Sequence, residues 1–65
     1  MKNRLLKRTQ VEALTSLSRS CIYSEMQAGR FPKPLKVSSK AVRWREMDIF
    51  NWMESLPHTG EAADS

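Results

Sequence analysis

The 65-residue sequence lacks the covalent and metal cross-links that stabilise many very small folds. Its one cysteine, Cys21, cannot form an internal disulfide, and Cys21 with the lone His58 cannot complete a zinc site. We therefore expect no metal and no cofactor, and a fold that rests on apolar packing. A chain of this length forms one small domain that buries only about 60% of its extended surface, so a deep catalytic cleft is not expected.

Long apolar runs and catalytic groupings are also missing. No stretch approaches the roughly 18 apolar residues of a membrane span, and the basic segment 1–8 has too few apolar residues for a signal peptide. Cys21 falls inside a predicted helix with no histidine nearby, and His58 follows Pro57. We therefore expect a cytoplasmic protein with no membrane partner and no enzymatic activity.

Basic residues are absent from the last 20 positions. Residues 1–45 hold all eleven Lys and Arg and two acids, a balance of 11 − 2 = +9, whereas residues 46–65 hold five acids and no base. The sum, 9 − 5, is the net charge of +4. This distribution favours an acidic partner for the first two thirds of the chain. Residues 57–65, small and acidic, are expected to form an unstructured tail.

Two short helices are predicted in the first half of the chain, after an edge strand within residues 4–7. The segment Thr9-Gln10-Val11-Glu12 matches a capping box, which predicts a helix that begins at Thr9 and ends near residue 16. Val11 and Leu14 would lie on its buried face. Ser18 is the expected N-cap of a second helix that runs to Ala28 and is terminated by Gly29.

The second helix should be apolar on one side and polar on the other. Its apolar stripe is Ile22 and Met26, with Cys21 beside them. The opposite side carries, at helical spacing, Arg19, Ser20, Tyr23, Ser24 and Gln27. A polar face with a single charge is suited to contact another molecule rather than the core.

The second half of the chain predicts a basic hairpin and a last helix. A proline-rich connector, residues 31–34, precedes two short strands at residues 35–37 and 41–44. The last helix should begin around Arg45 and Glu46, with acids in its first turn, and should end before Pro57. Its expected core face, at i, i+3, i+4 and i+7, consists of Ile49, Trp52, Met53 and Leu56.

Two helices joined by a short turn and followed by a hairpin predict a mainly α winged helix-turn-helix over residues 4–56. The major groove of DNA accepts one helix, and Arg19 could form two hydrogen bonds to guanine there. Ser18 would act first as a cap, whereas Arg30 and Lys33 in the connector would lie near phosphates. The expected DNA contacts are Ser18, Arg19, Ser20, Tyr23, Arg30, Lys33, Lys36, Ser38, Ser39, Lys40 and Arg43.

Aromatic residues leave one alternative open. Trp44 and Trp52 fall on apolar faces, so we assign them to the core rather than to base stacking. Phe50 lies off the expected core face of the last helix. An exposed Phe50 would favour a different function, a protein-interaction adaptor that binds a recombinase or polymerase subunit through this helix.

Three blocks of the sequence resemble a known family. They are Leu17-Ser18-Arg19-Ser20-Cys21-Ile22-Tyr23, then residues 29–36, then Val42-Arg43-Trp44-Arg45-Glu46 followed by Trp52. In this order they resemble the AlpA-type phage and prophage regulators, which belong with small excisionases in the MerR-like winged-helix group. The resemblance covers about residues 4 to 56.

The resemblance implies a DNA-binding protein of a mobile element. Such proteins activate integrase or excisionase genes, or act as recombination directionality factors that bend DNA, and an integrase or a second copy is an implied partner. The helix from Ser18 would be the recognition helix, and residues 38–43 would be the wing. The sequence departs from the family at Ser16, where a glycine is usual, and at Ser24 and Glu25, where a bulkier basic or apolar pair is usual.

Overall fold

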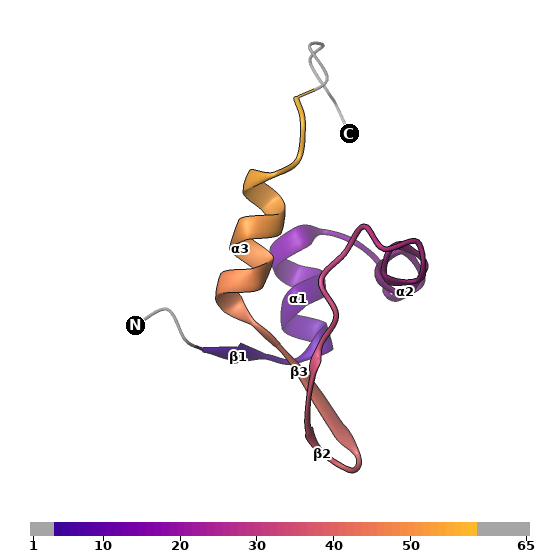
Figure 1. Cartoon of the computed structure of the whole chain (residues 1–65), viewed down its shortest axis with the longest axis vertical. Helices are drawn as coiled ribbons and strands as arrows, with labels where there is room; N and C mark the ends of the chain where they lie inside the picture. Colours follow the sequence, from indigo (N-terminus) through magenta and orange to yellow (C-terminus); the bar gives the residue numbers. More distant parts are fainter. Residues whose placement is uncertain (1–3, 59–65) are drawn as a thin grey trace.

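The computed structural model describes residues 4–58, which form three helices and a three-stranded sheet. The elements in chain order are β1 (Leu5–Leu6), α1 (Arg8–Thr15), α2 (Arg19–Gln27), β2 (Leu35–Ser38), β3 (Ala41–Arg45) and α3 (Glu46–Glu54). Figure 1 shows α1 between the other two helices, with the β2–β3 hairpin projecting away from them. This arrangement confirms the winged helix-turn-helix. Of the expected tail, residues 59–65 lie outside the described part of the chain.

The sheet joins the start of the chain to the wing. Its strand order is β1-β3-β2, antiparallel throughout, with Leu6 opposite Trp44 in the register of β1 and β3. The amide of Glu46 donates to the Arg4 carbonyl at 2.8 Å, and the Arg4 guanidinium lies 3.6 Å from the Glu46 carboxylate. The predicted edge strand is therefore confirmed, and β1 also anchors the first turn of α3.

The core lies where the sheet, the helices and the connector meet. Its buried side chains are Leu6, Val11, Ile22, Phe31, Trp44 and Ile49. Both tryptophans contribute, as predicted, since Trp52 and Met53 pack against this cluster. Two core predictions were wrong: Leu14 is 40% exposed on α1, and Leu56 is 47% exposed beyond the end of α3. Because α3 ends at Glu54 with Ser55 as its C-cap, residue 56 no longer follows the helical spacing.

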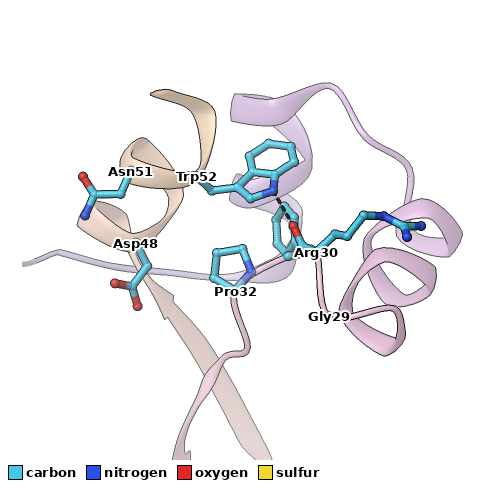
Figure 2. A pocket seen from close by; sticks show the side chains of 7 residues that line it. Gly29, Arg30, Pro32, Asp48, Asn51 and Trp52 are labelled. Atoms are coloured by element: carbon cyan, nitrogen blue, oxygen red, sulfur yellow. Dashed lines mark hydrogen bonds between the residues drawn. The ribbon is translucent and has the colours of Figure 1, made fainter. Parts of the chain in front are cut away.

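The connector between α2 and β2 contributes a core residue that the sequence pattern did not indicate. Phe31 is 5% exposed, and its ring meets Trp52 edge-on, with 4.7 Å between the ring centroids. The indole N–H of Trp52 donates to the Arg30 carbonyl at 2.7 Å (Figure 2). The indole N–H of Trp44 donates to the Pro32 carbonyl at 2.9 Å. Two tryptophans thus hold a segment that has no regular secondary structure.

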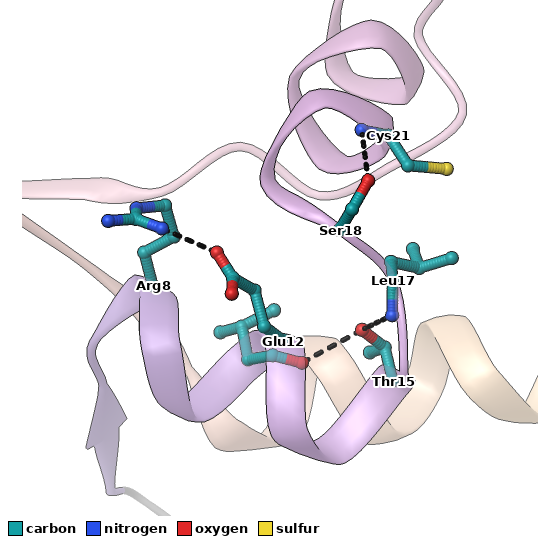
Figure 3. Close-up of polar contacts among 7 residues, drawn as sticks. Arg8, Glu12, Thr15, Leu17, Ser18 and Cys21 are labelled. Atoms are coloured by element: carbon teal, nitrogen blue, oxygen red, sulfur yellow. Dashed lines mark hydrogen bonds and ion pairs between the residues drawn. The ribbon is translucent and has the colours of Figure 1, made fainter.

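The N-cap of the first helix is Lys7, two residues before the predicted cap Thr9, and the helix begins at Arg8. Gln10 rather than Glu12 completes the cap, because its Oε1 accepts from the Lys7 amide at 2.8 Å. Glu12 instead forms an ion pair with Arg8, one helical turn away (Figure 3). An ion pair at i, i+4 favours the helix by a few tenths of a kcal/mol.

The turn between α1 and α2 is fixed by local hydrogen bonds. The Thr15 hydroxyl donates to the Val11 carbonyl at 2.8 Å and accepts from the Leu17 amide at 3.3 Å (Figure 3). Ser16 closes α1 in the left-handed conformation with φ of 63°, and its amide donates to the Glu12 carbonyl at 2.8 Å. The left-handed backbone at Ser16 gives a physical reason for the glycine that is usual there in the family that the sequence resembles.

Ser16→Gly is expected to stabilise the fold. The left-handed conformation costs a non-glycine residue about 1–2 kcal/mol, and the added freedom of glycine in the unfolded chain offsets about 0.4–1 kcal/mol of that gain. We expect the free energy of unfolding to rise by about 0.5–1 kcal/mol in urea titrations followed by circular dichroism. Ser16→Val should lower it, since a β-branched side chain tolerates this backbone least. A less stable Ser16→Gly protein would show that the turn carries no strain.

Candidate nucleic-acid interface

The recognition-helix candidate, α2, turns one face into the core and the other toward solvent. Ser18 caps it as predicted, since its Oγ accepts from the Cys21 amide at 3.2 Å (Figure 3). Ile22 is fully buried and Met26 packs beneath it. The exposed positions of the helix and its cap are Ser18, Arg19, Ser20, Tyr23, Ser24 and Gln27. In Figure 1, α2 lies on the opposite side of α1 from α3, so this face is free of the other helices.

Arg19 stands at the first turn of α2. Its guanidinium carbon lies 5.9 Å from the centre of the Tyr23 ring, an arrangement that holds the cation near the helix N-terminus. The ion pairs formed within residues 4–58 do not include Arg19. The first amides of a helix also attract anions. The end of α2 that carries Arg19 therefore presents both an unpaired cation and free backbone donors.

The wing is exposed along its whole β2 strand and at its tip. Ser38 Oγ accepts from the Lys40 amide at 3.3 Å, which shapes the turn, and Ser39 lies exposed between these two residues. Lys36 pairs with Val42 in the register of the hairpin, and a bulge separates Lys36 from Ser38. The tip therefore carries two serines and Lys40 on a short, solvent-exposed turn, and Lys36 lies on the strand that leads to it.

Two more predicted contacts lie in the connector and on β3. Lys33 is exposed in the connector, and Arg43 is half-buried on β3, where its guanidinium donates to the Val42 carbonyl at 2.7 Å. Like Lys36 and Lys40, neither residue takes part in an ion pair of the described chain. Four cations of the connector and wing are therefore free to meet an external anion.

Arg30 differs from the other predicted contacts because its charge is matched within the protein. Its Nε and a terminal nitrogen donate to the two carboxylate oxygens of Glu25 at 2.7 and 3.1 Å. The hydrogen bond from Arg30 lowers the pKa of Glu25, and the hydrogen bond to Glu25 raises the pKa of Arg30. Both groups therefore remain charged at neutral pH.

The ion pair between Glu25 and Arg30 was not predicted, because residues at this spacing do not share a face of a helix. The sequence pattern predicts instead that Arg30 lies near DNA phosphates. Gly29 with φ of 79° ends α2, and the Arg30 amide donates to the Glu25 carbonyl at 2.9 Å. Glu25 and Arg30 are five positions apart, and a continuous helix would place them on different faces. The reversal of the chain at Gly29 brings their side chains together. We did not predict Glu25 as a residue that contacts one of the candidate site residues. A glutamate and an arginine on either side of a glycine that ends a helix are the sequence feature that indicates such a contact.

Glu25→Gln should strengthen nonspecific DNA binding, because it removes the anion that neutralises Arg30. We expect the slope of log affinity against log salt to become steeper by about 1, the effect of one additional phosphate contact. Fluorescence anisotropy on random-sequence duplexes at several salt concentrations would measure it. Glu12→Gln is the matched control, since it frees a cation, Arg8, outside the predicted interface. An unchanged slope in Glu25→Gln would show that Arg30 does not reach DNA.

Within residues 4–58, no three His, Cys, Asp or Glu side chains gather in a way that could hold a metal ion. The helices in this part of the chain are too short or too polar to cross a bilayer.

Comparison with known proteins identifies the family. Residues 4–56 match the family described as "Prophage CP4-57 regulatory protein (AlpA)". The chain is similar to a protein of Enterobacteria phage P4 described as "Uncharacterized protein ORF88", with 35% identity over 52 residues that cover 80% of this chain and 59% of that protein. The match thus spans less than two thirds of the relative's length. No solved structure matches significantly. Since the family match extends over residues 4–56, the chain belongs to the AlpA family of prophage regulatory proteins.

Proposed function

We propose that the protein binds double-stranded DNA in a sequence-specific manner, with α2 in the major groove and the wing on the backbone or in the minor groove. The observation that carries this proposal is the pairing of two exposed features. The polar face of α2 bears an unpaired Arg19, and the hairpin that follows bears unpaired Lys36, Lys40 and Arg43. Base edges would be contacted from α2 and phosphates from the wing.

Membership of the AlpA family supports a regulatory role in a mobile element. We infer that the protein activates integrase or excisionase genes, or serves as a recombination directionality factor at an attachment site, and that it resides with cytoplasmic DNA. A module of this size buries only about 600–1,000 Å² on DNA, which favours self-association or several adjacent copies, with an integrase as a further partner. A promoter-reporter assay and an excision assay in parallel separate the two roles.

Arg19→Ala should relax sequence preference at one base pair. Losing an arginine that forms two hydrogen bonds with guanine costs about 1–3 kcal/mol on the preferred site and little on other sites. In vitro selection from random duplexes, followed by binding titrations, measures both values. Lys7→Gln is the control, because Lys7 is an exposed cation at the start of α1, outside the proposed interface. Equal weakening on every sequence would make Arg19 a phosphate contact, and no weakening would remove α2 from the interface.

One observation supports the alternative function, a protein-interaction adaptor. Met47 and Phe50, three residues apart on α3, are 40% and 37% exposed, so this flank of the helix presents apolar surface. We propose that a recombinase or polymerase subunit is the partner of this flank. Phe50→Ala should then preserve DNA binding in vitro while lowering reporter activation or excision in cells. Normal activity of Phe50→Ala in both cellular assays would leave the adaptor function without support.

A further inference from the structure

The orientation of α2 depends on what holds its two ends. Along its length, α2 is anchored by the fully buried Ile22 and by Met26, one helical turn later, which packs against the core. At its first end, the turn around Thr15 and Leu17 is fixed by the hydrogen bonds described above. At its last end, the chain passes through Gly29 into the connector and on to the wing. The connector, together with the turn and these core contacts, therefore sets how α2 is placed relative to the wing.

The connector, residues 29–34, is held by hydrogen bonds from the indole N–H groups of two tryptophans in other elements. Residues 29–34 have no helix or strand to satisfy their carbonyl groups, and Pro32 and Pro34 have no amide to donate. Trp52 donates to the Arg30 carbonyl at 2.7 Å, close to the end of α2. Trp44 donates to the Pro32 carbonyl at 2.9 Å, close to the start of the wing. Figure 2 shows the Trp52 indole from α3 directed at the Arg30 carbonyl.

The two tryptophans that hold the connector belong to different elements of the fold. Trp44 belongs to the wing itself, on β3, whereas Trp52 belongs to α3, which forms no part of the proposed DNA interface. Phe31 lies beside the Trp52 ring and joins the connector to the core. The bond from Trp52 therefore ties the last end of α2 to a rigid element behind the interface.

We propose that Trp52 is a positioning residue for DNA recognition: by holding the Arg30 carbonyl, it sets α2 relative to the wing without touching DNA. This inference rests on the proposed function. Hydrogen bonds to base edges require placement within about 0.5 Å, whereas flexible lysines of the wing reach phosphates over a range of positions. Loosening the connector should therefore weaken binding to the preferred sequence more than binding to random DNA.

Trp52→Phe tests the proposal because it keeps a six-membered aromatic ring against Phe31 and removes the five-membered ring that carries the indole N–H. We expect affinity for the preferred site, obtained by selection with the wild-type protein, to fall about 3- to 10-fold, the range set by one lost hydrogen bond. Affinity for random duplexes should not change, and the slope of log affinity against log salt concentration should not change either. Measurements are made well below the unfolding transition, where circular dichroism shows the variant to be folded.

Controls separate positioning from general destabilisation. Phe50→Leu alters an aromatic residue on the other flank of the same helix, and its ratio of specific to nonspecific affinity should stay at the wild-type value. Phe31→Leu loosens the connector while leaving both indole donors in place, so it should lower the ratio too, and it replaces Trp52→Phe if that variant does not fold.

Two results would overturn the proposal. One is an unchanged ratio of specific to nonspecific affinity in Trp52→Phe, or in Phe31→Leu where that variant takes its place. The other is a parallel loss of both affinities, which would mean that Trp52 only stabilises the fold. Failure of the proposed function is recognised separately, since it would appear in the wild-type protein as equal binding to all sequences.

Discussion

Raising the salt concentration from about 50 to about 200 mM should weaken DNA binding by the wild-type protein about 1,000-fold. Five of the predicted DNA contacts are cations that form no ion pair in the described part of the chain: Arg19, Lys33, Lys36, Lys40 and Arg43. With five or six phosphates neutralised, counterion release gives a slope of log affinity against log salt of roughly −4 to −6. Anisotropy titrations of a labelled duplex at four or five salt concentrations give this slope directly.

The wing can be tested within the same experiment. Lys36 and Lys40 are exposed and their side chains form no hydrogen bond or ion pair in the described structure, so the double change to glutamine leaves the fold intact. The slope should become shallower by about 2, one unit for each lost phosphate contact. Lys7→Gln, an exposed lysine outside the proposed interface, provides the control for net charge. A wild-type affinity that does not depend on salt would contradict the electrostatic part of the account.

Trp44→Ala should abolish most of the stability of the domain. Trp44 is fully buried, faces Leu6 across the sheet, and donates its indole N–H to the connector. Removing a buried tryptophan side chain costs about 3–5 kcal/mol. The single core of a domain of 65 residues rarely supplies more than about 3–5 kcal/mol of stability. We therefore expect the variant to be largely unfolded near 25 °C.

Urea and thermal unfolding followed by far-ultraviolet circular dichroism measure this loss. Phe50→Ala serves as the matched truncation of an aromatic side chain that is already partly exposed, and it should cost about 1 kcal/mol or less. Equal losses in the two variants would contradict the placement of Trp44 at the centre of the core.

Local hydrogen-bond patterns made parts of the fold predictable from the sequence. Ser18 caps α2, and Gly29 terminates it, because the partners of each lie within five residues along the chain. The hairpin and its tip follow from alternation of apolar and polar residues over a few positions. The N-cap of α1 was misplaced by two residues because Gln10 stands three residues after Lys7, as Glu12 does after Thr9, and the sequence does not show which of the two side chains meets an amide.

Features that depend on tertiary packing were not predictable in the same way. Phe31 sits between a glycine and a proline-rich stretch, where no helical or strand periodicity indicates burial, and it is buried because Trp52 closes over it. Leu14 fits the helical spacing of a core position, yet no neighbouring element covers it. The pairing of β1 with β3 joins residues some 40 positions apart, which periodicity alone does not reveal.

The exposure and the charge pairing of the predicted contact residues follow from the sequence, with one exception. Those on α2 and at the wing tip are exposed, as the amphipathic pattern of α2 and the composition of the turn indicate. The pairing of Arg30 with Glu25 is the exception, because their contact arises from a chain reversal after a helix rather than from spacing within one.

The central claim is that α2 contacts base edges in the major groove through Arg19. Methylation interference on the selected duplex tests it most directly, because dimethyl sulfate modifies guanine N7, the atom that an arginine contacts in that groove. We predict that methylation of one guanine in the site blocks binding of the wild-type protein and has no effect on binding of Arg19→Ala. Binding by the wild-type protein that tolerates methylation of every guanine, or an identical interference pattern for Arg19→Ala, would contradict the account.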